Sequence, residues 1–253
     1  MSSSKKFRAT LVNDMDTAVL YLRLEGPLQS WGDRSAFWSR QTSFFPTKSG
    51  VLGLLFCAMG LGGARQSELA EFAPLPMAAY RIGPKGKNRP PVLMDFHMVG
   101  AHYDESDPWQ LECIPKTSEG KKAVGGGTRL TRREYLQDGR FAVLLTIPSS
   151  WKEKVREGLE SPVWDIYLGR KSCAPAVPVF GGLFADESSA KQALERELAQ
   201  RADDGESAPW AVLEVQQETS ESDPLGESVP DVPICFGPTK QYTTRRVKVV
   251  SLI

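Results

Sequence analysis

The sequence has no excess of charge of either sign. Its 253 residues include 31 lysines and arginines and 31 aspartates and glutamates, so the formal net charge is zero. The acids are unevenly spread, because the segment 203–231 holds nine of them and no lysine or arginine. Whole-chain charge therefore neither favours nor excludes a polyanionic partner, and any basic surface has to be local. An acidic loop over 203–231 is expected to lie away from such a surface.

Cysteines and long apolar runs are also scarce. The four cysteines show no C-x-x-C spacing, which argues against a zinc ribbon, and Cys57 is expected to be a reduced core residue. The longest apolar run, Val51 to Leu61, is too short for a bilayer span of about 20 residues. Residues 1–16 are polar and charged, unlike a secretory leader. We therefore expect a soluble, cytoplasmic protein with no membrane contact, no metal and no cofactor.

Strand patterns alternate with helix patterns along the chain. Residues 17–24 alternate between two faces, Gly26-Pro27 ends that strand, and Asp138-Gly139 predicts the turn of a hairpin between 128–136 and 140–147. Further strands are expected over 77–82, 92–99, 163–168, 210–215 and 242–252. Helices are expected after an N-cap at Thr47 or Ser49, over 150–158 and over 188–202. This order predicts an α+β fold with a mainly antiparallel sheet, such as a ferredoxin-like core.

The loop between the first strand and the first helix carries aromatic and cationic side chains. They are Trp31, Arg34, Phe37, Trp38 and Arg40, with Lys48 at the start of the helix. Aromatic rings interleaved with arginines suit a polyanion that has stackable bases. Aromatic residues more often fill a core, so base stacking and core packing both stay open for each ring.

Lys48 and Ser49 resemble the end of a phosphate-binding P-loop. That motif needs glycines where this chain has Thr42 and Thr47, so nucleotide hydrolysis is not supported. A lysine at a helix N-terminus can still meet a phosphate, because the free N–H groups and the macrodipole favour anions there. A phosphate contact and a solvated lysine remain the two alternatives.

Two other groups are candidates for a binding site. Asp95, His97 and His102 include metal-ligating residue types, but a structural or RNA-contacting His97 is favoured over a metal site. Residues 128–135 place cations on both faces of a strand, and Arg170 and Lys171 add two more. These cations form either a solvated basic strand or a track for an RNA backbone.

Five strings carry a family resemblance. In chain order they are L-R-L-E-G-P-L-Q-S-W-G from Leu22, F-P-T-K-S-G-V-L-G-L-L from Phe45, D-F-H from Asp95, T-R-R-E-Y-L from Thr131 and Y-L-G-R-K-S-C-A-P from Tyr167. Together they closely resemble the CasD family of type I-E CRISPR–Cas systems. The combination is specific, although any one string alone would be weak.

The resemblance implies a non-catalytic, RNA-binding subunit of the Cascade surveillance complex, in the RAMP superfamily. Such a subunit has a ferredoxin-like or RRM-like palm with an inserted thumb, here with additional C-terminal strands. The expected division is a flexible extension over 1–16, a palm over 17–83 and 128–253, and a thumb over 84–127. The implied partners are the 5′ handle of the CRISPR RNA, the backbone subunit CasC, the large subunit CasA and the target DNA that the complex holds.

The side chains expected at the RNA combine motif positions with chemistry. Cations suit phosphates, aromatic rings suit bases, and serine or glutamine suits base edges or 2′-hydroxyls. The expected RNA-binding residues are Gln29, Trp31, Arg34, Arg40, Lys48, Ser49, His97, Arg129, Arg132, Arg133, Tyr135, Arg170 and Lys171.

Two other functions stay open. Related subunits in another subtype cut the repeat, so a metal-independent endoribonuclease is the main alternative. Its general base and acid would come from His97, Lys48 or Tyr135. The other is an RRM-like RNA-binding module outside CRISPR.

Overall fold

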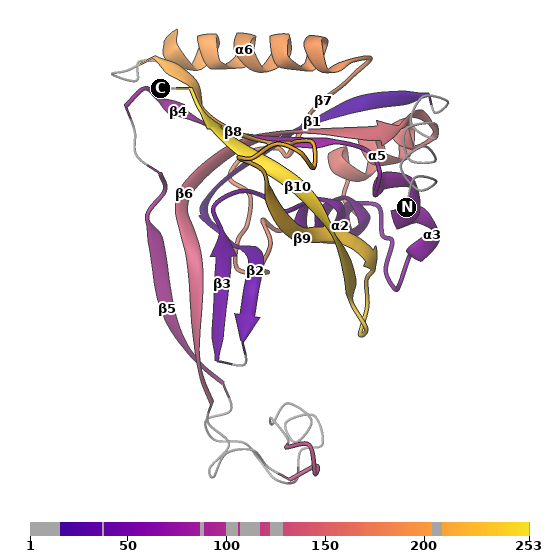
Figure 1. Ribbon diagram of the computed structural model, residues 1–253, viewed down its shortest axis with the longest axis vertical. Helices are drawn as coiled ribbons and strands as arrows, with labels where there is room; N and C mark the ends of the chain where they lie inside the picture. Colours follow the sequence, from indigo (N-terminus) through magenta and orange to yellow (C-terminus); the bar gives the residue numbers. More distant parts are fainter. Residues whose placement is uncertain are drawn as a thin grey trace.

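The computed structural model describes residues 16–36, 38–86, 89–99, 106, 117–121, 129–203 and 209–252 (Figure 1). Within them the fold is α+β, with one ten-stranded, largely antiparallel sheet and helices on both of its faces. The candidate residues Phe37 and His102, and residues 1–15 of the extension expected over 1–16, lie outside the described part of the chain.

The strands are β1 (Thr17–Gln29), β2 (Trp31–Ala36), β3 (Ser39–Ser43), β4 (Met77–Pro84), β5 (Val92–Val99), β6 (Arg129–Pro148), β7 (Phe180–Phe184), β8 (Trp210–Glu218), β9 (Glu227–Cys235) and β10 (Gln241–Ser251). The helices are α2 (Lys48–Ala58), α3 (Gln66–Phe72), the 3₁₀ turn η1 (Ser149–Trp151), α5 (Lys152–Glu160) and α6 (Glu187–Asp203).

The longest strand, β6, has two partners on each of its edges. Its first half pairs with β5 on one edge and with β3 on the other, and its second half pairs with β1 and β4. The first half of β6, together with β2, β3 and β5, projects away from the rest of the sheet (Figure 1). We call this projection the blade and the remainder the body.

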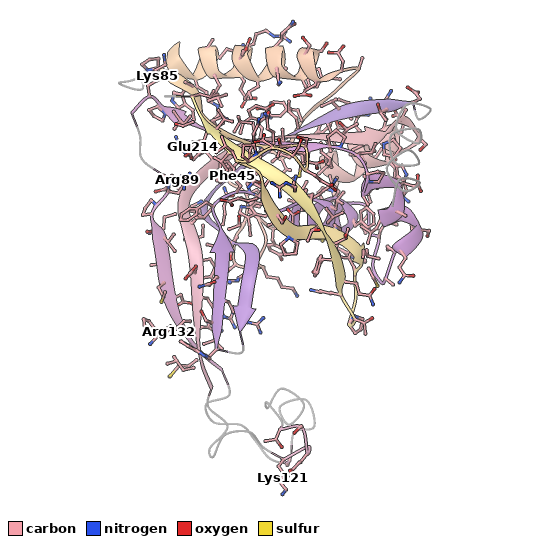
Figure 2. All side chains as sticks on the ribbon, viewed as in Figure 1. Phe45, Lys85, Arg89, Lys121, Arg132 and Glu214 are labelled. Carbon is pink, nitrogen blue, oxygen red and sulfur yellow. The ribbon has the colours of Figure 1, made fainter. Side chains whose placement is uncertain are left out.

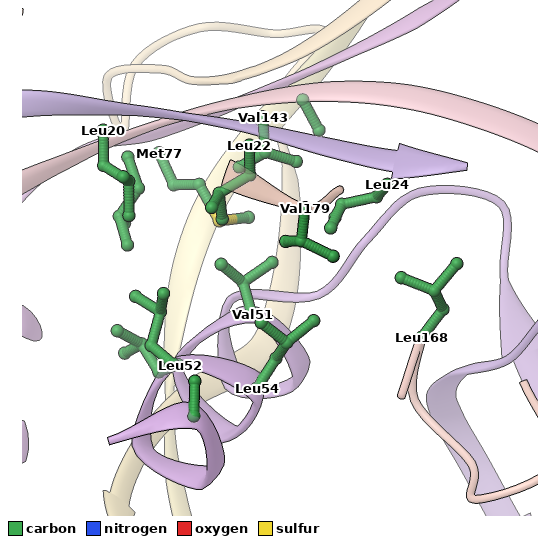
Figure 3. Packing of buried hydrophobic residues seen from close by; sticks show 14 of the residues in the cluster. Leu20, Leu22, Leu24, Val51, Leu52, Leu54, Met77, Val143, Leu168 and Val179 are labelled. Carbon is green, nitrogen blue, oxygen red and sulfur yellow. The ribbon is translucent and has the colours of Figure 1, made fainter. Parts of the chain in front are cut away.

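The body is a three-layer arrangement. Helices α2, α3 and α5 lie against one face of the sheet, and α6 lies along the other (Figure 1). In Figure 3, Leu20, Leu22 and Leu24 of β1 point towards Val51 and Leu54 of α2, and all of them are buried. Burying a side chain of this size stabilises the fold by about 1.5–3 kcal/mol each, so this layer is the main core.

The alternation predicted for the first strand is confirmed. Its odd-numbered residues face the opposite layer, where Val19 and Tyr21 pack against α6. Arg23 on the same face donates from Nε to Glu197 of α6 over 2.9 Å, and the Tyr21 hydroxyl donates to the same carboxylate. These hydrogen bonds lower the pKa of Glu197, although its partial burial acts in the opposite direction.

The predicted hairpin at Asp138-Gly139 is wrong, because β6 runs straight through it. A tight hairpin of this kind needs two consecutive residues with positive φ, and only Asp138 has one, at 50°. The break predicted at Gly26-Pro27 is also wrong. Gly26 pairs with Gly139 and Leu28 with Gln137, so β6 keeps β1 extended on both sides of the proline.

Three other segments differ from their predicted structure. Residues 163–168 form no strand, because the Val163 N–H and the Leu168 N–H donate to carbonyls of α2 and of their own loop. The expected loop at 30–46 contains β2 and β3. The expected acidic loop at 203–231 contains β8 and the start of β9, and Glu214 and Asp231 within it pair with arginines.

A buried ion pair joins the C-terminal strands to helix α2. Arg245 of β10 donates from Nε and Nη2 to both oxygens of Asp231 on β9, over 2.8 and 2.9 Å. Both residues are buried, and Asp231 also accepts the backbone N–H of Lys48 over 2.8 Å. Asp231 therefore occupies the N-terminus of α2 with a carboxylate of the protein itself.

Arg245→Met should lower the free energy of unfolding by about 3–5 kcal/mol, because it leaves a buried carboxylate without its charge partner. Lys248→Met on the same strand is the matched control. It removes a partly exposed pair with Asp223 and should cost about 1 kcal/mol or less. Urea unfolding of both variants measures the difference, and equal losses would contradict the structural role assigned to Arg245.

Candidate nucleic-acid interface

A cleft of about 640 Å³ opens where the blade meets the body. It is bounded by β2 and β3, the exposed side of α2, the loop 61–63, the loop 164–170 and the β9–β10 connection. Among its described lining residues there is no aspartate or glutamate. Its cationic side chains are Arg40, Arg170 and Lys240, and its aromatic side chains are Trp31, Phe56, Trp164, Tyr167, Phe236 and Tyr242. Cations and rings around a concave surface are the groups that single-stranded nucleic acid needs.

Arg170 is held in place at the cleft wall. Its guanidinium donates to the carbonyl oxygens of Glu134 and Arg40, each over 2.9 Å, and lies 4.8 Å from the centre of the Tyr135 ring. Three fixed contacts leave it with a defined orientation, and its charge is not matched by a carboxylate in these contacts. Tyr135 is thereby buried under Arg170 rather than exposed for stacking.

Gly169 explains how the loop brings Arg170 so close to β1 and β2. Its φ is +95°, and a Cβ at this position would lie 1.8 Å from the Ser30 carbonyl oxygen. The Ser30 N–H also donates to the Leu168 carbonyl over 3.0 Å. This hydrogen bond joins the loop that carries Arg170 to the end of β1. Only glycine permits both the dihedral angle and the approach.

Two predicted RNA ligands, Gln29 and Trp31, are core residues instead. Both have no exposed surface. The Trp31 indole N–H donates to the Gln29 carbonyl over 3.0 Å, and the Gln29 amide donates to the Leu24 and Gly139 carbonyls. Trp31 therefore forms the floor beneath the cleft, where base stacking is not open to it.

Lys48 is neither solvated nor placed to contact a phosphate, which were the two alternatives from the sequence. The side chain is 1% exposed, and its ammonium donates to the carbonyls of Ala73 and Leu75 beside Glu218. Burial lowers the pKa of Lys48, and the Glu218 carboxylate opposes this shift. Lys48 thus binds the C-terminal end of α3, and a phosphate cannot reach it without rearrangement.

The N-cap prediction for α2 is confirmed at Thr47. Its hydroxyl accepts the Gly50 N–H over 3.3 Å. Ser49 is half-buried and lines the cleft, so its hydroxyl remains beside the candidate site.

The remaining predicted residues lie on the blade or at its base. Arg132 and His97 are exposed, Arg133 is half-buried, and Lys171 is exposed next to Arg170. His97 lies 3.8 Å from Asp95 on the same strand. The other two, Arg34 in β2 and Arg129 in β6, belong to the blade strands, and their side chains are outside the described part of the chain.

Sequence reasoning missed five residues of the cleft, which are Gln41, Trp164, Tyr167, Lys240 and Tyr242. The segment holding Trp164 was expected to be a strand, and Tyr242 was expected only to be part of a closing strand. One signal was available, since Tyr167 begins the Y-L-G-R-K-S-C-A-P string. Lys240 had no such signal, because only the β9–β10 connection brings it to the cleft.

Cys57 also lines the cleft, at the exposed side of α2. Its thiol donates to the Asp165 carbonyl over 3.3 Å. Burial raises the pKa of this thiol, and the Asp165 charge raises it further. The predicted core position is wrong, because Cys57 is only half-buried and lies outside the buried cluster. Its thiol is protonated and therefore a poor nucleophile. Across the described helices, none is long and apolar enough to cross a membrane.

Comparisons with known proteins give a consistent result. A family model for the CRISPR-associated protein Cas5 matches residues 19–248. The CRISPR system Cascade subunit CasD of Escherichia coli (strain K12) is 33% identical over 171 residues, which cover 64% of this chain and 70% of that protein.

Two solved structures are similar over nearly the whole chain. A chain of a CRISPR RNA-guided surveillance complex superposes with a TM-score of 0.65 at 26% identity, covering 92% of this chain and 89% of its own length. A crystal structure of a Cas protein superposes with a TM-score of 0.55 at 27% identity, covering 92% and 94%.

Gly169→Ala should destabilise the fold by more than about 2 kcal/mol, because a Cβ there overlaps a backbone carbonyl in addition to the cost of positive φ. Gly63→Ala is the matched control, since its φ of +89° is similar but nothing lies within 4 Å of an added Cβ. It should cost only about 1–2 kcal/mol. Chemical unfolding of both variants tests this, and indistinguishable midpoints would contradict the close approach of the two segments.

Proposed function

Because this chain belongs to the Cas5 family of CRISPR-associated proteins, we propose that it is the non-catalytic subunit of a Cascade-type surveillance complex that binds the 5′ handle of the CRISPR RNA. The similar E. coli protein is a Cascade subunit, and the more similar solved structure is an RNA-guided surveillance complex. The observation that carries the RNA-binding proposal is the cleft, with its three cations and its lack of described acids.

The cleft chemistry fits a single strand of RNA better than a small metabolite. Arg40, Arg170 and Lys240 stand on three separate elements, so they can follow successive phosphates. Trp164 and Tyr242 are each more than two-fifths exposed and offer ring faces to unpaired bases. Ser49 and Gln41 add hydrogen-bonding groups for base edges or 2′-hydroxyls.

In this proposal the body acts as the ferredoxin-like or RRM-like palm, and the segment 84–127 as the thumb. The β5 strand of that segment pairs with β6, so the thumb would begin on the blade (Figure 1). The blade projects away from the body and would meet the backbone subunit CasC, and the complex would place the large subunit CasA and the target DNA nearby.

The arrangement of candidate catalytic groups supports a non-catalytic role. His97 lies opposite Thr131, and Tyr135 follows four residues further along β6, so their backbones are roughly 13 Å apart at about 3.3 Å per residue. A general base and acid acting on one phosphodiester each need to be within about 3 Å of it. Lys48 is buried elsewhere. These three groups therefore do not form one site.

Purified protein should leave labelled repeat RNA intact, both with and without EDTA, because the candidate groups His97, Lys48 and Tyr135 do not lie at one site. Gel analysis of the RNA after incubation is the measurement. A site-specific cut that persists in EDTA and disappears in His97→Ala would instead establish the endoribonuclease alternative.

Lys240→Ala and Arg40→Ala should each weaken binding of handle RNA and lower the slope of log K against log salt by about one. Lys191→Ala is the control, because this exposed lysine lies on α6 at the opposite face of the sheet. Affinities measured at several salt concentrations give the slopes. If all three variants retain the wild-type slope, the cleft is not the phosphate track.

A further inference from the structure

Three exposed side chains form a stack on the blade. The Arg132 guanidinium carbon lies 5.1 Å from the centre of the Trp38 ring and 5.4 Å from the centre of the Phe96 ring. The three residues come from the β2–β3 turn, β6 and β5, and Figure 2 shows Arg132 far down the blade, away from the body. The stack therefore crosses the blade from one element to the next.

The backbone fixes the order of the three layers. Phe96 lies directly opposite Arg132 in the β5–β6 ladder, so the two side chains share a face of the sheet. The Arg132 N–H donates to the Trp38 carbonyl over 2.7 Å, which places Trp38 on the other side. A planar cation is thus held between two rings.

The stack is open to solvent, unlike a structural brace. Trp38 is 55% exposed and Phe96 is 57% exposed. No carboxylate in the described part of the chain pairs with Arg132, whereas Arg81 and Arg245 in the body each pair with one. An uncompensated positive charge between exposed rings attracts an anion that has a flat, polarisable surface.

Strand β3 connects the stack to the cleft. Ser39 and Arg40 of β3 pair with Arg132 and Arg133 of β6, and Arg40 lines the cleft. Trp38 is two residues from Arg40, which corresponds to about 7 Å of strand. Trp38 therefore lies within reach of a nucleic-acid strand that passes Arg40.

From these contacts we infer that the Trp38–Arg132–Phe96 stack is a second binding site, at which an unpaired nucleobase stacks on an exposed ring while its phosphate faces Arg132. The inference rests on the proposed RNA-binding function and adds a base-stacking site outside the cleft. It makes no use of base-edge hydrogen bonds, so the site accepts any base.

The test compares two fluorescein-labelled probes of equal length, single-stranded oligoadenylate and the same chain with abasic riboses. With the full-length protein, Trp38→Ala and Phe96→Ala should each weaken oligoadenylate binding by roughly 5- to 100-fold. Binding of the abasic probe should change less than twofold. The slope of affinity against salt should stay at its wild-type value, because neither variant removes a charge.

Two further variants sharpen the result. Arg132→Lys keeps the charge but loses the planar group, so it should weaken oligoadenylate binding and retain the salt slope. Met98→Ala is the matched control, since Met98 is exposed on the same face of β5 and lies outside the stack. It should bind both probes as the wild type does.

Several outcomes would overturn the inference. Equal losses on both probes, or wild-type affinity in Trp38→Ala and Phe96→Ala, would exclude base stacking while leaving the cleft proposal intact. Base stacking would also be excluded if Trp38→Ala and Phe96→Ala bind RNA normally but no longer assemble with the other complex subunits. The stack would then be a protein-docking surface. Failure of the wild-type chain to bind either probe would overturn the proposed function as well.

Discussion

The antiparallel pairing of β6 with β1 determines which face of the sheet each core uses and where the blade begins. The register runs from Thr17 opposite Pro148 to Gln29 opposite Leu136, and each side chain of β1 is assigned to one of the two cores by it. A slip of one residue would exchange the leucine face for the face that meets α6. Beyond this ladder β6 continues into the blade, so the same register sets where Arg132 and Arg133 stand relative to the cleft.

Many charged side chains of this neutral chain are used in ion pairs and hydrogen bonds within the body. The acids of 203–231 that were expected to repel RNA include Glu214 and Asp231, which hold arginines of β4 and β10 inside the body. Several cations are likewise committed to structure, as Lys48 is to the end of α3. Arg40, Arg170 and Lys240 at the cleft and Arg132 on the blade, by contrast, pair with no carboxylate of the described residues, so their charge is available to a polyanion.

Much of the body could be predicted from the sequence, because local periodicity determined it. The two faces of β1, the Thr47 cap of α2 and the limits of α6 follow from spacing alone. The failures arise from contacts with other segments, which local periodicity does not contain. Asp138-Gly139 resembles a turn locally, but β1 holds it extended, and the Trp31 ring resembles a base-stacking group until Gln29 and α2 enclose it. The stack at Arg132 joins three separate segments, so no single stretch of sequence indicates it.

The same long-range pairing has a consequence for synthesis on the ribosome. Gln29 precedes Pro148, the far end of its partner strand, by roughly 120 residues, and β7 follows later still. At about 5–20 residues per second, β1 leaves the ribosome roughly 6–24 s before β6 is complete. During that interval an apolar strand with two open edges has no partner in its own chain. The apolar residues of β1 therefore stay unpaired and open to aggregation until β6 has been synthesised.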